Sequence, residues 1–142
     1  MTVNQISIFL ENKYGTLSEI LMLLAEANIR IIAATVADTS EYGILRIIVN
    51  DPQRAYALLK EHNVSANLSD VLAIVTHSEA AGFARTLQAF TKAGLTIEYM
   101  YCFSAGEKSI LIIRTNNREA AREVIRRQNM DYLCENDLLK FN

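Results

Sequence analysis

Residues 44–50 read ILRIIVN and residues 110–116 read ILIIRTN, so one apolar pattern returns after 66 positions. Extending this match outward places residues 5–63 on residues 71–129 without a gap. Eleven aligned pairs are identical, and the apolar pattern agrees well beyond them. The identical pairs are Ile8/Ile74, Leu21/Leu87, Ala27/Ala93, Ile31/Ile97, Glu41/Glu107, Ile44/Ile110, Leu45/Leu111, Ile47/Ile113, Asn50/Asn116, Ala55/Ala121 and Asn63/Asn129. Such self-similarity indicates two copies of one structural unit.

Each copy predicts the same succession of elements. A short apolar run typical of a strand comes first, at residues 5–10 and 71–76. Apolar residues at helical spacing follow, at 17–27 and 83–93. Two strands joined by a polar turn come next, at 29–37 and 44–49 and again at 95–103 and 110–115. A second helix and a last short strand complete each copy, the strand at 64–68 having a weaker counterpart at 132–135.

Several residues mark where the helices begin and end. Asn28 and Gly94 follow the last residue of the helical pattern, where a left-handed residue commonly ends a helix. Asp51 followed by Pro52 is a typical helix start, with an N-capping side chain and proline in the first turn. These residues support the predicted order.

The order βαββαβ, occurring twice, is the ferredoxin-like arrangement. Right-handed crossovers place both helices of a copy on one face of an antiparallel sheet. We therefore predict an α+β fold of two tandem ferredoxin-like units, at residues 1–69 and 70–142.

The second face of each predicted sheet is also apolar. One side of residues 44–49 carries Leu45 and Ile47, and the other carries Ile44 and Ile48. A sheet with one solvated face would alternate with polar residues. The second face is therefore predicted to be covered by the other repeat, by another chain, or by both. Because a 66-residue unit has a small core, we expect extensive contact between the repeats and a homodimer.

Composition excludes several classes of protein. Apolar residues make up 51% and charged residues 21% of the 142-residue chain, with a net charge of −2. No basic field exists to hold a nucleic acid, and the central strands lack the aromatic residues with which RNA-binding modules of similar topology stack bases. No stretch approaches the roughly 20 apolar residues of a membrane span. With two cysteines and no apparent signal peptide, we expect a reduced, cytoplasmic protein.

Catalytic constellations are scarce. His77, Ser78 and Glu79 are adjacent in the sequence, so they cannot face one another as a relay. His62 is expected near a helix end, where it complements the last carbonyl groups. Cys102 is expected to be a buried structural thiol. Without a phosphate-binding loop or a metal-ligand pattern, we expect neither an enzyme nor a cofactor.

The loop after the first strand is the best candidate for ligand binding. It comprises Glu11, Asn12, Lys13, Tyr14, Gly15, Thr16 and Leu17. Gly15 permits a positive φ, and Thr16 is expected to cap the following helix. Free amides and the helix dipole at that start attract an anion such as a carboxylate, and Asn12 offers an acceptor for an ammonium group. The alternative is an ordinary strand-to-helix turn.

The same residues resemble a known family. NKYGTLSEILMLLAEANIRI at 12–31 resembles the N-x-P-G-x-L loop, helix and second strand of ACT domains. ADTSEYGILRIIVNDP at 37–52 and AGLTIEYMYCF at 93–103 are similar to the hairpin and second strand of small tandem ACT proteins. The resemblance covers essentially the whole chain. It implies a module that senses a free amino acid and acts on a metabolic enzyme.

The resemblance also implies where the ligand binds, which is at interfaces between paired ACT domains. The matching positions in the first copy are the loop residues Asn12, Gly15, Thr16 and Leu17, with Asp38, Thr39 and Ser40 at the hairpin entrance. In the second copy they are His77, Ser78, Gly82, Phe83, Tyr99 and Tyr101. Tyr14 replaces the usual proline, and Gly82 is displaced by one position, so the two sites are expected to differ. The competing hypothesis is a structural adaptor that docks on an enzyme without a small ligand.

Overall fold

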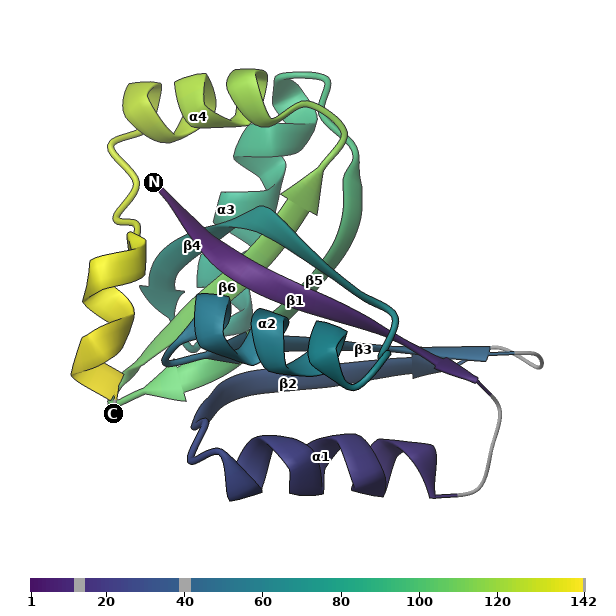
Figure 1. Ribbon diagram of the computed structural model, residues 1–142. Helices are drawn as coiled ribbons and strands as arrows, with labels where there is room; N and C mark the ends of the chain where they lie inside the picture. The colour runs from purple at the N-terminus through teal and green to yellow at the C-terminus, as the bar shows by residue number, and fades with distance from the viewer. Residues whose placement is uncertain (12–14, 39–41, 142) are drawn as a thin grey trace. The chain divides into compact units, whose positions relative to one another are not determined.

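The computed structural model describes residues 1–11, 15–38 and 42–141 (Figure 1). It confirms the predicted α+β order, two βαββαβ patterns in succession. The elements are β1 (Thr2–Glu11), α1 (Thr16–Glu26), β2 (Ile31–Asp38), β3 (Tyr42–Val49), α2 (Pro52–Glu61), β4 (Ala66–His77), α3 (Ala80–Lys92), β5 (Ile97–Ala105), β6 (Lys108–Thr115), α4 (Arg118–Arg127) and a 3-10 helix, η1 (Glu135–Phe141).

The chain divides into two compact units, which are described separately. The N-terminal unit comprises Asn4–Asp70 together with the segment that begins at Leu138, and the C-terminal unit comprises Met1–Val3 and Val71–Asp137. Strand β4 therefore contributes its first residues to one unit and the rest to the other. The two short strands predicted here form one strand because residues 64–77 contain neither glycine nor proline to break it.

In the N-terminal unit the strand order is β2-β3-β1-β4, and β3 pairs antiparallel with both β1 and β2. Ile6 and Ile8 of β1 lie opposite Ile47 and Leu45 of β3, so these four side chains share a face. Together with Ile20, Leu24, Ala55 and Leu59 of α1 and α2, they form one buried core. Both helices therefore cover the same face of the sheet, as predicted.

The C-terminal unit repeats this arrangement with strand order β4-β6-β5, again antiparallel. Its core joins Leu72 and Ile74 to Leu111 and Ile113, with Phe90 of α3 fully buried among them. The predicted last strand is reduced to a bridge between Ile74 and Tyr132. The Cys134 amide donates instead to a carboxylate oxygen of Asp137 at 2.7 Å, and the chain turns into η1.

The second face of the sheets is covered, as predicted from its apolar residues. Ile48, Ile110 and Ile112 do not belong to the helix-side cores, yet each is at most 2% exposed in the single chain. The predictions for Cys102 and His62 differ in outcome. Cys102 is exposed, so the prediction of a buried thiol is wrong. His62 lies just past α2 and places Nδ1 3.0 Å from the Leu58 carbonyl oxygen, as predicted.

The ends of α1 and α3 and the start of α2 are built as the sequence predicted. Asn28 and Gly94 have φ values of 57° and 79°, the left-handed conformation that ends a helix. Asp51 caps α2 by accepting a hydrogen bond from the Arg54 amide, with Pro52 in the first turn. Among the described residues, no helix is long and apolar enough to cross a membrane.

The repeated Asn50 and Asn116 tie the end of each hairpin to the residue just before its first strand. The Asn50 Oδ1 accepts from the Arg30 amide at 2.9 Å, and the Asn116 Oδ1 accepts from the Thr96 amide at 3.0 Å. We expect Asn50→Ala to lower the free energy of unfolding by about 1 kcal/mol, because the Arg30 amide loses its acceptor.

Urea titration followed by circular dichroism would measure this loss. Asn67→Ala is the matched control, because it makes the same substitution at an exposed asparagine of β4. Equal losses in both variants would contradict a specific role for Asn50.

Candidate functional site

The first residues of α1 carry the ligand-binding prediction for the first copy. Gly15 has a φ of 87°, and its carbonyl oxygen accepts the first helical hydrogen bond, from the Glu19 amide at 3.0 Å. Thr16 was expected to cap this helix but is its first residue, and no described side chain caps α1. The left-handed Gly15 occupies the capping position, so Thr16 already has helical geometry. The amides of the first turn therefore point outward without a described side-chain acceptor.

Two of the other predicted residues of the first copy, Leu17 and Asp38, belong to the described residues. Asn12, Lys13, Tyr14, Thr39 and Ser40 lie outside them. Leu17 is half-buried against the core.

The register of the sheet relates the predicted loop to the hairpin entrance. Glu11 of β1 pairs with Tyr42, and Asp38 of β2 pairs with Gly43. Glu11 and Asp38 thus flank the start of β3 at the same end of the sheet, roughly 10 Å apart by ordinary strand spacing. The structure brings the start of the predicted loop and the hairpin entrance to one end of the N-terminal unit.

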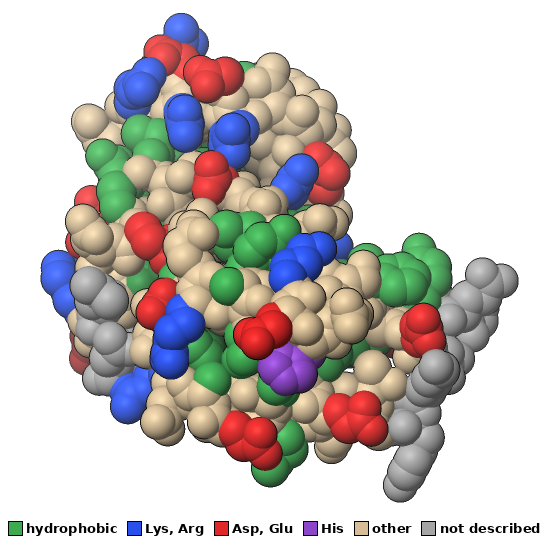
Figure 2. All heavy atoms as spheres, viewed as in Figure 1, with side chains coloured by type: hydrophobic (Ala, Val, Ile, Leu, Met, Phe, Trp, Pro, Cys, Tyr) green, Lys and Arg blue, Asp and Glu red, His purple; other side chains and the backbone are tan. Residues whose placement is uncertain are grey.

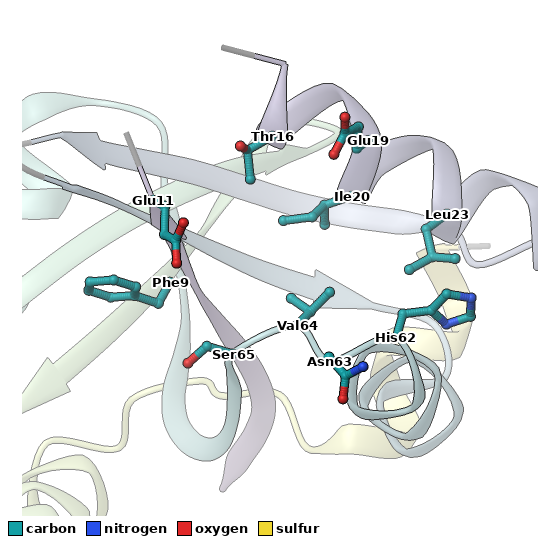
Figure 3. A pocket seen from close by; sticks show the side chains of 10 residues that line it. All are labelled: Phe9, Glu11, Thr16, Glu19, Ile20, Leu23, His62, Asn63, Val64 and Ser65. Carbon is teal, nitrogen blue, oxygen red and sulfur yellow. The ribbon is translucent and has the colours of Figure 1, made fainter. Parts of the chain in front are cut away.

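A groove of about 460 Å³ opens beside the start of α1 (Figure 3). It runs between α1, the end of β1 and the connection from α2 to β4, all within the N-terminal unit. Ile20 and Leu23 point from α1 toward Val64 across the groove. The lining residues are Phe9, Glu11, Thr16, Glu19, Ile20, Leu23, His62, Asn63, Val64 and Ser65. The groove thus combines an apolar floor with a polar rim.

The rim has the polar groups that an amino acid would need. Glu11 and Glu19 bring carboxylates, and both residues are exposed. The first-turn amides near Thr16 bring partial positive charge at the same end of the groove. Carboxylate acceptors and amide donors around an apolar floor suit a small zwitterion with an apolar side chain.

In the C-terminal unit, His77 and Ser78 stand at the end of β4. His77 is exposed and pairs with Lys108 of β6. The Ser78 hydroxyl lies 3.0 Å from the Ser109 hydroxyl and donates to the Glu107 carbonyl oxygen at 3.3 Å. Ser78 therefore holds the start of β6 against the end of β4.

Gly82 and Phe83 lie in the first turn of α3. A Cβ on Gly82 would approach the His77 carbonyl oxygen and the Thr76 Oγ1 to 3.0 Å, so the helix contacts the end of β4 closely here. Gly82 has no positive φ and therefore differs from the left-handed Gly15 of the first copy. Phe83 is half-buried against the core of its unit.

Tyr99 and Tyr101 lie far along β5 from His77. His77 and Ala105 pair with the same residue, Lys108, so Ala105 marks the corresponding end of β5. Six residues of strand separate Tyr99 from Ala105, a distance of roughly 20 Å. Within the C-terminal unit, the structure does not bring Tyr99 to His77 and Ser78.

Sequence reasoning missed most of the groove. Among the described residues, only Glu11 and Thr16 belong to both the predicted loop and the groove lining, and Glu11 was not predicted to bind the ligand. The helical spacing of Thr16, Ile20 and Leu23 was a usable signal, since it places them on one face of α1. In the described part of the chain, no three His, Cys, Asp or Glu side chains are grouped to hold a metal ion.

Comparison with known proteins agrees with this architecture. A family model described as "ACT domain pair" matches residues 1–142. The chain is similar to protein BT0572 from Bacteroides thetaiotaomicron, with 38% identity, a TM-score of 0.92, and coverage of 99% of this chain and 97% of that chain. No functionally curated protein matches it.

Two more distant structures share the fold. The ligand-free regulatory subunit of aspartate kinase from Thermus thermophilus is 22% identical, with a TM-score of 0.60 and coverage of 87% of this chain and 91% of that chain. The regulatory subunit of aspartate kinase from Thermus flavus is also 22% identical, with a TM-score of 0.57 and coverage of 87% and 90%.

Proposed function

The chain belongs to the family of ACT domain pairs, and from this membership we propose that it binds a free amino acid and modulates a metabolic enzyme. The regulatory role fits the family. The observation that supports a ligand most directly is the groove of about 460 Å³ beside the uncapped start of α1.

The proposed binding mode follows from the charges of the groove. The ligand carboxylate accepts hydrogen bonds from the first-turn amides of α1, where the helix dipole favours negative charge. The ligand ammonium is balanced by Glu11 or Glu19 on the rim. An apolar side chain lies on Ile20 and Leu23, away from water.

We further propose that the site is completed by a neighbouring ACT domain in a homodimer. Strand β2 is at one end of the strand order, and its Val36 side chain is 48% exposed on the face shared with the core. An open strand edge and an exposed apolar side chain favour association with another copy. A ligand held there would bind one arrangement of the domains better, which is the requirement for allosteric regulation.

The enzyme partner is proposed on the fold shared with regulatory subunits of aspartate kinase. Under the adaptor hypothesis, the protein also docks on an enzyme but binds no small ligand.

A thermal-shift screen against the free amino acids tests the proposal. An amino acid present at about 100 times its dissociation constant should stabilise the protein by about 2.7 kcal/mol, and one or two amino acids should give saturable shifts. Sedimentation of the same sample should give a dimer. A flat screen on a folded dimer would reject amino-acid sensing in favour of the adaptor.

Two glycine variants locate the site. Gly15→Val and Gly94→Val both place a β-branched residue at a positive φ, with nothing within 4 Å of the new Cβ, so both should lose stability to backbone strain. Of these two variants, only Gly15→Val, at the start of α1, should also lose the ligand-induced shift. Asn12→Ala should lose this shift as well. Equal ligand shifts in both glycine variants would move the site away from this loop.

A further inference from the structure

The helices of the two units differ sharply in charge. Helices α3 and α4 together carry six arginine or lysine side chains and two glutamates. Helices α1 and α2 carry two such cations and three glutamates. In a chain with a net charge of −2, positive charge is thus concentrated on the helices of the C-terminal unit. Figure 2 shows Lys and Arg side chains gathered over α4 at the top of the view.

A shallow polar cavity of about 270 Å³, open to solvent and with all four of its polar lining residues exposed, lies within this region, between α3 and the end of α4. Arg85, Gln88 and Lys92 project into it at helical spacing from α3, and Gln128, the residue that ends α4, completes it. The fifth lining residue is Ala89, so every polar side chain in the lining is a cation or an amide. This chemistry favours an anion with several acceptor oxygens.

The two cations of the cavity are not neutralised by any carboxylate among the described residues. The glutamates of α4 are engaged elsewhere, Glu119 with Arg122 and Glu123 with Arg126 and Arg127. Neither Arg85 nor Lys92 has an ion-pair partner among the residues that the structure describes.

The nearby helix ends do not need these cations either. Backbone amides already bind the exposed carbonyl groups there, with Gly94 donating to Thr91, Leu95 to Phe90, and Met130 to Ile125. Lysine in a last helical turn often serves those carbonyl groups, but here the backbone does so. Arg85 and Lys92 therefore remain available to an external group.

We propose that this cavity binds the phosphate group of a small molecule. A phosphate carries a charge of about −1.5 to −2 near neutral pH and three acceptor oxygens, which match one guanidinium, one ammonium and two amides. The Arg85 fork can donate two parallel hydrogen bonds, and Lys92 supplies a second full charge. The site is independent of the proposed amino-acid groove, whose lining residues belong to the other unit.

Titration with inorganic phosphate, followed by calorimetry at constant ionic strength, tests this proposal on the intact chain. Wild-type protein should bind saturably, and Arg85→Gln and Lys92→Gln should each weaken binding by about tenfold or more, the worth of a charge-assisted hydrogen bond. Arg30→Gln is the matched control, because it removes one exposed positive charge from the N-terminal unit. Its affinity for phosphate should be unchanged.

A second measurement locates the bound group. In two-dimensional nitrogen–proton NMR spectra, the side-chain amide signals of Gln88 and Gln128 should shift during the titration. A simple phosphate monoester that displaces inorganic phosphate with higher affinity would identify a phosphorylated metabolite as the natural ligand, and one that fails to bind would identify free phosphate. Absence of saturable binding, or equal weakening in Arg30→Gln, would overturn the proposal.

Discussion

Phe90→Ala is expected to lower the free energy of unfolding by about 3–5 kcal/mol, the usual cost of removing a buried aromatic ring. Phe90 is fully buried and is the largest side chain in the core of the C-terminal unit. Its removal leaves a cavity between α3 and the sheet that Leu111 and Ile113 cannot fill without shifting. Urea-induced unfolding followed by circular dichroism measures the change.

Phe9→Ala is the matched control, because it makes the same substitution at a ring that is 46% exposed. Phe9 stacks on Tyr42 with 4.9 Å between ring centroids, so its loss should cost about 0.5–1.5 kcal/mol. Equal effects of the two substitutions would contradict the assignment of Phe90 to the core.

Ile112→Asn should destabilise the protein by at least about 3 kcal/mol, since it removes apolar volume and buries an amide without a partner. Ile112 is fully buried on the face of the sheet that does not meet the helices, and it pairs with Ala73 and Tyr101. The burial is present within a single chain. The loss should therefore not depend on protein concentration, which unfolding at two concentrations would check.

Ser104→Asn provides the comparison for Ile112→Asn. Ser104 is an exposed residue of the adjacent strand β5, so an asparagine there keeps contact with water and should change the stability by less than about 0.5 kcal/mol. A small effect of Ile112→Asn would mean that the second face admits water.

The parts of the fold that depend on local chemistry were predictable from the sequence. Asn28 and Gly94 adopt the left-handed conformation that ends a helix, and Asp51 caps α2, because these properties belong to the residue and its immediate neighbours. The helix-side cores were also predictable, since period-two and helical patterns assign faces directly. Family membership agrees with the resemblance seen in the sequence.

The errors concern properties that depend on distant residues. Cys102 lies opposite Leu111 and faces the core side like Met100, but it belongs to the edge strand β5 and is exposed. Periodicity gives the face of a side chain and not how far the helices extend over it. The bridge at Tyr132 likewise replaces a predicted strand because a hydrogen bond between Cys134 and Asp137 turns the chain away.

The candidate groove was largely beyond sequence reasoning for the same reason. Thr16 and Ile20 are close in sequence, but Val64 comes from a connection more than 40 residues away. Only the packing of α1 beside the connection from α2 to β4 creates the space between them. The left-handed Gly15 was anticipated, whereas its occupation of the capping position in place of Thr16 required the backbone.

The division of the chain has a consequence for how the protein is made. The N-terminal unit includes the segment that begins at Leu138, whose side chain is 1% exposed, and the C-terminal unit includes Met1–Val3. On a ribosome, the N-terminal unit can thus become complete only after the second repeat and the segment that begins at Leu138 have emerged. Cutting the chain between the two repeats would leave each half without a short piece of its own unit, so each repeat expressed alone should be less stable than the same repeat in the whole chain.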